Sequence, residues 1–99
     1  MREFKISTLF EKNTKKLKGK ELSNFLNKFD EILSIPNLNF YKNLRHDFKK
    51  FKRVHVNNSY VILFFDENNI VHFVDYVSHD KAYKHDKNSI KKYSRLDFK

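Results

Sequence analysis

The chain has 99 residues, 39% of them hydrophobic and 16% aromatic, so it can bury one small core and we expect a single domain over residues 1–99. Lys and Arg number 21 against 12 Asp and Glu, and the formal net charge of +9 favours a polyanionic partner such as nucleic acid. The chain lacks cysteine, a signal-peptide core and an apolar run of membrane length, which excludes disulfide frameworks and thiolate metal sites and predicts a cytoplasmic protein.

The first third of the sequence predicts one strand and a short helix. Residues 2–7 alternate between polar and apolar side chains, which is typical of a strand with one buried face. Ser7 or Thr8 is suited to cap a helix that follows this strand. Gly19 is the only glycine of the chain and is expected to end that helix in a left-handed conformation.

A second helix is predicted from about Lys20 to Ser34. Apolar residues recur there three and four positions apart, and Pro36 is expected to end the helix. We expect the two helices to pair and to cover one face of a sheet.

The second half of the chain predicts an antiparallel meander. Three runs rich in Val, Ile, Phe and Tyr are separated by the turn compositions NNS and DENN, and these runs cover residues 51–56, 60–65 and 70–77. Directly afterwards, Ser78 is suited to cap a helical turn that places His79 and Tyr83 on one face. The last apolar alternation, Ile90 to Phe98, fits either a short helix or a final strand.

Basic and aromatic residues interleave just before the meander. Cations can hold phosphates while rings stack on unpaired bases, so this composition is typical of RNA binding, although an acidic protein would also satisfy the charge. The basic members of the cluster are Lys42, Arg45, Lys49, Lys50, Lys52 and Arg53.

The order of these segments resembles the RelE/ParE superfamily of toxins from toxin-antitoxin systems. The similarity covers most of the chain and rests on FKISTLFEKNTKKL, NLRHDFKKFKRVHV, SYVILFF and VSHDKAYKH. Within the superfamily, RVHVNNSYVILF followed by HDKAY is most similar to the YafQ-like branch. The resemblance implies an α+β, RelE-like fold, in which an N-terminal strand and two helices pack on an antiparallel sheet with a three-stranded meander and a short C-terminal helix.

The resemblance also implies a function. Toxins of that branch are ribosome-associated endoribonucleases that cleave mRNA and are held off by a cognate antitoxin, whose acidic helix is expected to pack along the toxin. Their two histidines match His55 and His79, and an aromatic residue matches Tyr83. The implied reaction uses neither a metal nor a small-molecule cofactor, and no membrane takes part.

Metal-free RNA cleavage needs a base for the 2′-hydroxyl proton, an acid for the leaving 5′-oxygen and cations for the phosphorane charge. Histidine suits both proton roles because its unperturbed pKa is ~6.5. We therefore expect His55 and His79 to form the acid-base pair, in unassigned roles, and Tyr83 to stack on or hydrogen-bond the substrate. The expected RNA-binding residues are Arg45, His46, Lys49, Lys50, Lys52 and Arg53. No zinc motif relates the histidines, so no metal site is predicted.

Three positions depart from the family pattern. An arginine often follows the Tyr that opens the second meander strand, where this chain has Val61. An aspartate of the YafQ-like branch would fall near Ser59, and the RelE-like arginine of the last strand has no counterpart in residues 74–77. These departures keep two alternatives open: a non-catalytic or degenerate RelE fold that binds RNA or an antitoxin, and a ParE-like gyrase inhibitor.

Overall fold

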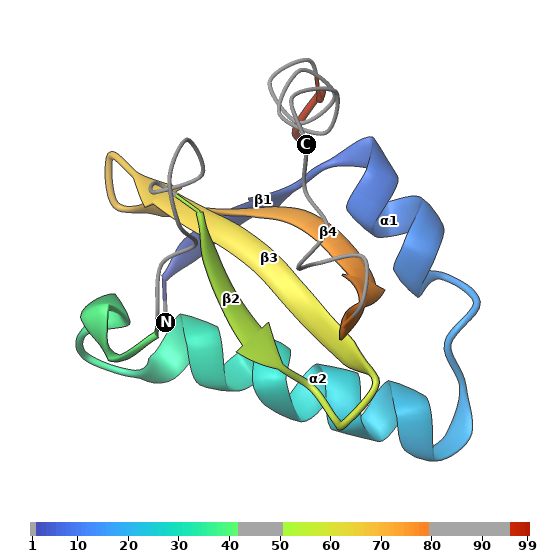
Figure 1. Ribbon diagram of the computed structural model, residues 1–99. Coiled ribbons are helices and arrows are strands. Elements are labelled where there is room, and N and C mark those ends of the chain that lie inside the picture. The colour runs from blue at the N-terminus through green and yellow to red at the C-terminus, as the bar shows by residue number, and fades with distance from the viewer. Residues whose placement is uncertain (1, 42–50, 80–95) are drawn as a thin grey trace.

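The computed structural model describes residues 2–41, 51–79 and 96–99 and shows a mixed α+β fold (Figure 1). This confirms the fold class expected from the sequence. In chain order the elements are β1 (Glu3–Ile6), α1 (Thr8–Thr14), α2 (Gly19–Ser34), the short 3-10 helix η1 (Leu38–Phe40), β2 (Lys52–His55), β3 (Tyr60–Glu67) and β4 (Ile70–Ser78).

The four strands form one sheet in the order β1-β4-β3-β2. The last three strands are the predicted antiparallel meander, whereas β1 runs parallel to β4 at the edge. The chain end returns to this edge, because Ile6 and Lys99 exchange two backbone hydrogen bonds and Ser7 pairs with Phe98. Part of the predicted C-terminal alternation is therefore paired in a strand-like way, while the predicted short C-terminal helix falls within residues 80–95, outside the described residues.

Asparagine side chains and backbones make both turns of the meander. In the turn between β3 and β4, Asn68 and Asn69 have φ angles of 56° and 65°. Two successive residues with positive φ are the hallmark of the type I′ hairpin turn, which matches the twist of the flanking strands. Between β2 and β3, the side-chain oxygen of Asn57 accepts hydrogen bonds from the backbone N–H groups of Ser59 and Tyr60 at 2.7 and 2.9 Å.

The start of α1 is fixed by Ser7, one of the two predicted caps. Its hydroxyl oxygen accepts a hydrogen bond from the backbone N–H of Phe10 at 2.9 Å, and the hydroxyl donates to the carbonyl of Val74 at 2.6 Å. The helix ends at Thr14, earlier than predicted, and Gly19 with a φ of 63° is the first residue of α2 rather than the end of α1. The expected left-handed glycine therefore opens the second helix.

The sheet carries a hydrophobic cluster on each face. On one face, α2 contributes Phe25, Ile32 and Leu33 to a core with the inward residues of β2, β3 and β4. On the other face, residues of the sheet pack with Leu96 and Phe98 from the chain end. The expectation that both helices cover one face of the sheet holds for α2. In contrast, α1 lies beside β4 (Figure 1). Its Phe10 belongs to the first cluster, and its Leu9 packs against the second.

Within the described residues, no helix is both long enough and apolar enough to cross a membrane.

Candidate functional site

His55 and His79 lie side by side at one end of the sheet. Their ring centroids are 5.1 Å apart and the ring planes are inclined by 34°. His55 is the last residue of β2, and His79 follows the last residue of β4 in helical conformation. The turn between β2 and β3 helps to hold the second histidine, because the backbone N–H of His79 donates to the carbonyl of Ser59 at 2.7 Å.

The surroundings of His55 disfavour its protonation. The side chain is exposed at the end of β2, yet partial desolvation lowers its pKa below the ordinary value of 6.5, and the nearby charges of His79 and Arg53 lower it further. Two imidazoles at this distance repel each other when both carry a proton, so the doubly protonated state is disfavoured. A neutral ring can accept a proton and a protonated ring can donate one, so the pair can supply both functions at the same place.

The pairing of β2 with β3 decides which basic residue faces the histidines. His55 pairs with Val61 and Arg53 pairs with Leu63, and side chains two positions apart share one face of a strand. Lys52 pairs with Phe64 on the opposite face and is only 6% exposed. Of the two expected phosphate ligands in β2, the structure therefore brings Arg53 to the side of His55 and turns Lys52 away.

The remaining predicted site residues lie outside the described residues: Tyr83, Arg45, His46, Lys49 and Lys50. All three places where the sequence departs from the family pattern lie within the described residues, and residues 74–77 belong to β4. Val61 is fully buried in the hydrophobic cluster on the face of His55. Ser59 is exposed, and its carbonyl accepts a hydrogen bond from the backbone N–H of His79. Both have local structural roles.

His72 lies elsewhere, near the turn between β3 and β4. Its ring stacks on Phe65 with centroids 4.6 Å apart and meets the edge of Phe98 at 5.1 Å. Its Nδ1 is 3.2 Å from the carbonyl oxygen of Ile70. Across the described part of the chain, no group of three or more His, Cys, Asp or Glu side chains is placed to hold a metal ion.

An open pocket of about 420 Å³ adjoins the second histidine. It is lined by Asn58, Ser59, Tyr60, Ser78 and His79. Tyr60 was not among the site residues expected from the sequence. It is 38% exposed, and its ring stacks in parallel on that of Tyr76 with centroids 5.1 Å apart. The only available signal was its place, directly after a turn at the start of a strand.

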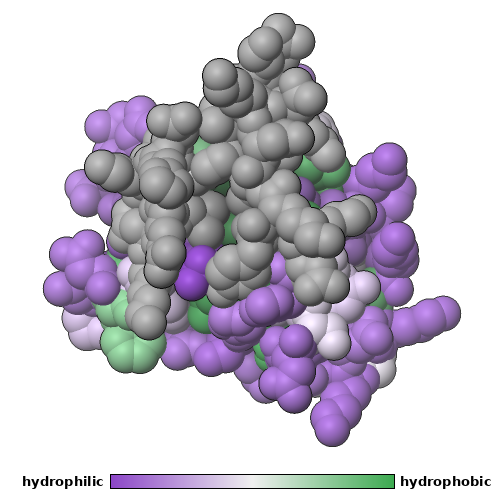
Figure 2. Space-filling view, in the orientation of Figure 1, coloured by the Kyte–Doolittle hydropathy of each residue, from purple (hydrophilic) through white to green (hydrophobic). Residues whose placement is uncertain are grey.

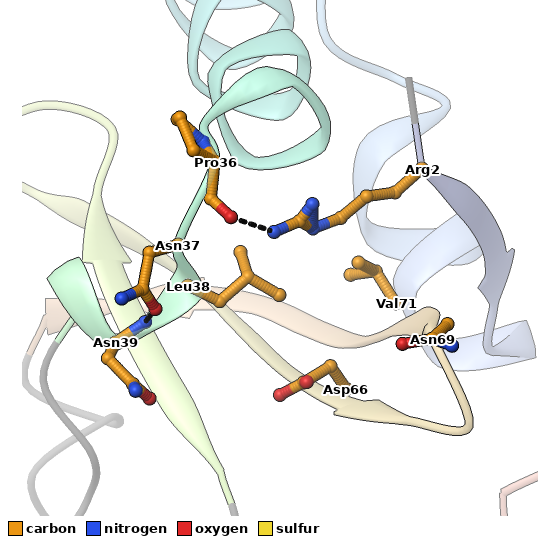
Figure 3. A pocket seen from close by; sticks show the side chains of 8 residues that line it. All are labelled: Arg2, Pro36, Asn37, Leu38, Asn39, Asp66, Asn69 and Val71. Carbon is orange, nitrogen blue, oxygen red and sulfur yellow. Dashed lines mark hydrogen bonds between the residues drawn. The ribbon is translucent and has the colours of Figure 1, made fainter.

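A smaller pocket of about 270 Å³ lies at the opposite end of the sheet (Figure 3). Arg2 and Asp66 both line this pocket. The guanidinium of Arg2 donates a hydrogen bond to the carbonyl of Pro36 at 3.0 Å. The arginine is thus engaged with the protein itself, and the histidine pair remains the stronger candidate site.

Comparison with known proteins finds a relative that is named as a toxin. The chain is 49% identical over 67 residues to a protein of Methanocaldococcus jannaschii named "Putative toxin RelE4", an alignment covering 66% of this chain and 69% of that protein. No protein-family model matches the chain.

Solved structures share the fold. A copper-bound mutant toxin from Helicobacter pylori superposes with a TM-score of 0.58 at 11% identity, over 84% of this chain and 100% of that one. A chain of the E. coli DinJ-YafQ complex superposes with a TM-score of 0.55 at 15% identity, over 84% and 99% of the two chains.

Proposed function

The chain belongs to the RelE family of toxins, and on that premise we propose that it is an endoribonuclease that cleaves mRNA by metal-free acid-base catalysis. The observation that carries the proposal is the distance of 5.1 Å between the ring centroids of His55, at the end of β2, and His79, directly after β4. Pairs of titratable groups whose environments favour different protonation states are the arrangement that acid-base catalysis needs.

The lowered pKa of His55 suggests its role. A base must be neutral to accept a proton, and burial with the adjacent charges of His79 and Arg53 keeps His55 neutral near pH 7. His55 takes the proton of a ribose 2′-hydroxyl, whose oxygen attacks the adjacent phosphorus. His79 then protonates the 5′-oxygen as the bond from phosphorus to that oxygen breaks. The products are a 2′,3′-cyclic phosphate and a 5′-hydroxyl end.

Arg53 supplies the charge that this reaction needs at the phosphorus. Its place on the face of His55 allows a guanidinium to contact the phosphate oxygens on which negative charge develops. Further RNA contacts are proposed for Tyr83, Arg45, His46, Lys49 and Lys50. The ribosome is the proposed place of cleavage.

We also infer that a cognate antitoxin neutralises the chain. One of its structural neighbours was solved as the DinJ-YafQ toxin-antitoxin complex, and the net charge of +9 on this chain favours an acidic partner. Co-expression with the product of a neighbouring acidic reading frame should give a complex that purifies together and relieves growth arrest. Arrest that persists despite formation of the complex would separate binding from neutralisation.

The proposal is tested by induced expression in a heterologous host, with mRNA ends mapped by primer extension. New ends within translated frames are expected for the wild type and not for His79→Ala. His72→Gln is the matched control, because it changes a histidine that lies away from the pair, and it should retain cleavage. Arrest without new ends would instead support a gyrase target, and neither arrest nor new ends would support a non-catalytic RNA-binding or antitoxin-binding protein.

A further inference from the structure

The stacked tyrosines of β3 and β4, Tyr60 and Tyr76, line a second pocket at the same end of the sheet as the histidine pair. This pocket of about 520 Å³ lies between the two helices and the end of the sheet, and it is lined by Asn13, Lys16, Leu17, Glu21, Tyr60, Tyr76, Val77 and Ser78. Tyr60 and Ser78 also line the pocket that contains His79. Tyr60 and Ser78 are thus shared by the two pockets at the end of the sheet, where Tyr60 lies with Tyr76 on the face of α2 and His55 lies with Val61 on the opposite face.

Tyr60 has the geometry of a stacking platform. Its ring lies parallel to that of Tyr76, with an angle of 2° between the planes and 5.1 Å between the centroids. Tyr76 is buried at 4% exposure, so it fixes the orientation of its partner, whereas Tyr60 is 38% exposed. A rigid, partly exposed ring is what an unpaired nucleobase requires for stacking.

The surroundings of the second pocket combine positive charge with one carboxylate. Lys16 lines the pocket, and the neighbouring lysines in the chain, Lys12, Lys15, Lys18 and Lys20, are also exposed. Figure 2 shows hydrophilic residues gathered on this side of the molecule, over α1 and the start of α2. Such a rim attracts the phosphates of a single strand.

Glu21 stands close to the stacked pair. Burial raises the pKa of Tyr76 to about 12, and the negative charge of Glu21 is the next contribution. A carboxylate repels phosphate but accepts hydrogen bonds from the exocyclic amino groups of bases such as cytosine. Asn13 also lines this pocket, and its side-chain amide donates a hydrogen bond to the carboxylate of Asp75 at 2.7 Å.

We propose that this pocket binds one unpaired RNA base, stacked on Tyr60 and adjacent to the phosphodiester held between the two histidines, and that Glu21 favours bases with an exocyclic amino group. The inference rests on the proposed function for the position of the cut. Binding of the base itself requires no cleavage. Tyr60 is then a positioning residue for the substrate, and the strand runs from the histidine pair over the end of the sheet towards Lys16.

The test is equilibrium binding of fluorescent single-stranded oligonucleotides with 2′-O-methyl riboses, which cannot undergo 2′-hydroxyl attack. Tyr60→Ala and Tyr60→Leu should weaken binding by about 5-fold to about 150-fold, the usual range for loss of one stacked base, whereas Tyr60→Phe should bind like the wild type. The leucine variant preserves apolar packing on Tyr76, so a loss common to both variants reports stacking, with thermal unfolding of each variant as the check on folding.

Two further comparisons test the surroundings of the platform. Lys16→Gln should reduce the salt dependence of binding by about one unit of slope, and Lys5→Gln on the distant strand β1 should not. The wild type should prefer an oligocytidine to an oligouridine by at least about 5-fold, and Glu21→Gln should reduce that preference.

Cleavage of ordinary RNA by the same variants separates this inference from the proposed function. Binding that depends on Tyr60 in a protein without cleavage activity would support the base pocket and overturn the endoribonuclease. Cleavage by the wild type together with unchanged oligonucleotide binding by Tyr60→Ala and Tyr60→Leu would overturn the base pocket alone. Absence of measurable oligonucleotide binding by the wild type would also overturn it, and equal affinity for the two homopolymers would remove the role of Glu21.

Discussion

Lys52 and Arg53 are neighbours in the chain but lie on opposite faces of β2. Arg53 pairs with Leu63 on the face of His55, and Lys52 pairs with Phe64 and is only 6% exposed. Two cations that look equivalent in the sequence therefore have different surroundings. One is placed to act on a phosphate, while the other is enclosed by the protein.

This difference predicts opposite effects of the same substitution. Arg53→Gln should slow RNA cleavage by at least about tenfold, because a cation is lost where charge develops, and should lower the free energy of unfolding less than Lys52→Gln does. Lys52→Gln should mainly lower stability, because it replaces a charged side chain that the protein encloses. Single-turnover cleavage and urea unfolding of both variants measure the two effects. Equal loss of activity with intact stability in both would contradict the assignment of faces.

The pH dependence of cleavage should report His55. Burial and the charges of His79 and Arg53 lower its pKa below 6.5, and a general base is active only when deprotonated. The value of kcat/KM should therefore rise with pH through an apparent pKa below 6.5 and fall again at higher pH as the acid loses its proton. Arg53→Gln removes one of the charges and should move the acidic limb to higher pH. An acidic limb at or above pH 6.5 in the wild type would refute the assignment of His55 as the base.

Ser7 should contribute more to stability than its size suggests. It is fully buried, caps α1 through the N–H of Phe10 and donates to the carbonyl of Val74. Ser7→Ala removes both hydrogen bonds and should lower the free energy of unfolding by about 2 kcal/mol. The exposed neighbour Thr8 is the control, since Thr8→Ala should change urea unfolding by less than about 0.5 kcal/mol. Equal stability of the two variants would argue against this capping arrangement.

The turn between β3 and β4 should tolerate only certain side chains. With a φ of 65°, Asn69 has a backbone that glycine adopts without strain and that a β-branched residue resists. Asn69→Gly should preserve or raise stability, and Asn69→Val should lower it by about 1 to 2 kcal/mol in thermal or urea unfolding. Asn58→Val, in the other turn of the meander, is the comparison, and a loss there as large as that of Asn69→Val would disprove the special role of the left-handed turn.

Local signals predicted the elements of the fold well. The period-two runs and the asparagine-rich turns located the three meander strands to within a few residues, because both signals depend on neighbours in the chain. The end of α1 was misplaced, since Leu17 continues the helical spacing although the helix ends at Thr14. Gly19 was correctly expected to be left-handed, but the turn in which it serves is the entry to α2.

The candidate site was predictable only in part. The family resemblance pointed to His55 and His79, whose ring centroids lie 5.1 Å apart in the structure, and their catalytic role stays a prediction. The face of Lys52 and Arg53 could not be decided from sequence, because a shift of one residue in strand pairing exchanges the two faces. Tyr60 gave no local signal beyond its place at the start of a strand, since its orientation depends on Tyr76 from another strand.

The central claim is that His55 is the base and His79 the acid in RNA cleavage. The most direct measurement uses an RNA whose scissile 5′-oxygen is replaced by sulfur, a leaving group that departs without protonation, presented both alone and on ribosomes. Loss of a general acid or base from ordinary RNA cleavage should cost between about 10²-fold and about 10⁴-fold. If His79 is the acid and His55 the base, His79→Ala should recover nearly wild-type cleavage on the sulfur substrate, whereas His55→Ala should remain slow. Recovery by His55→Ala, or no recovery by His79→Ala beside an active wild type, would contradict this assignment.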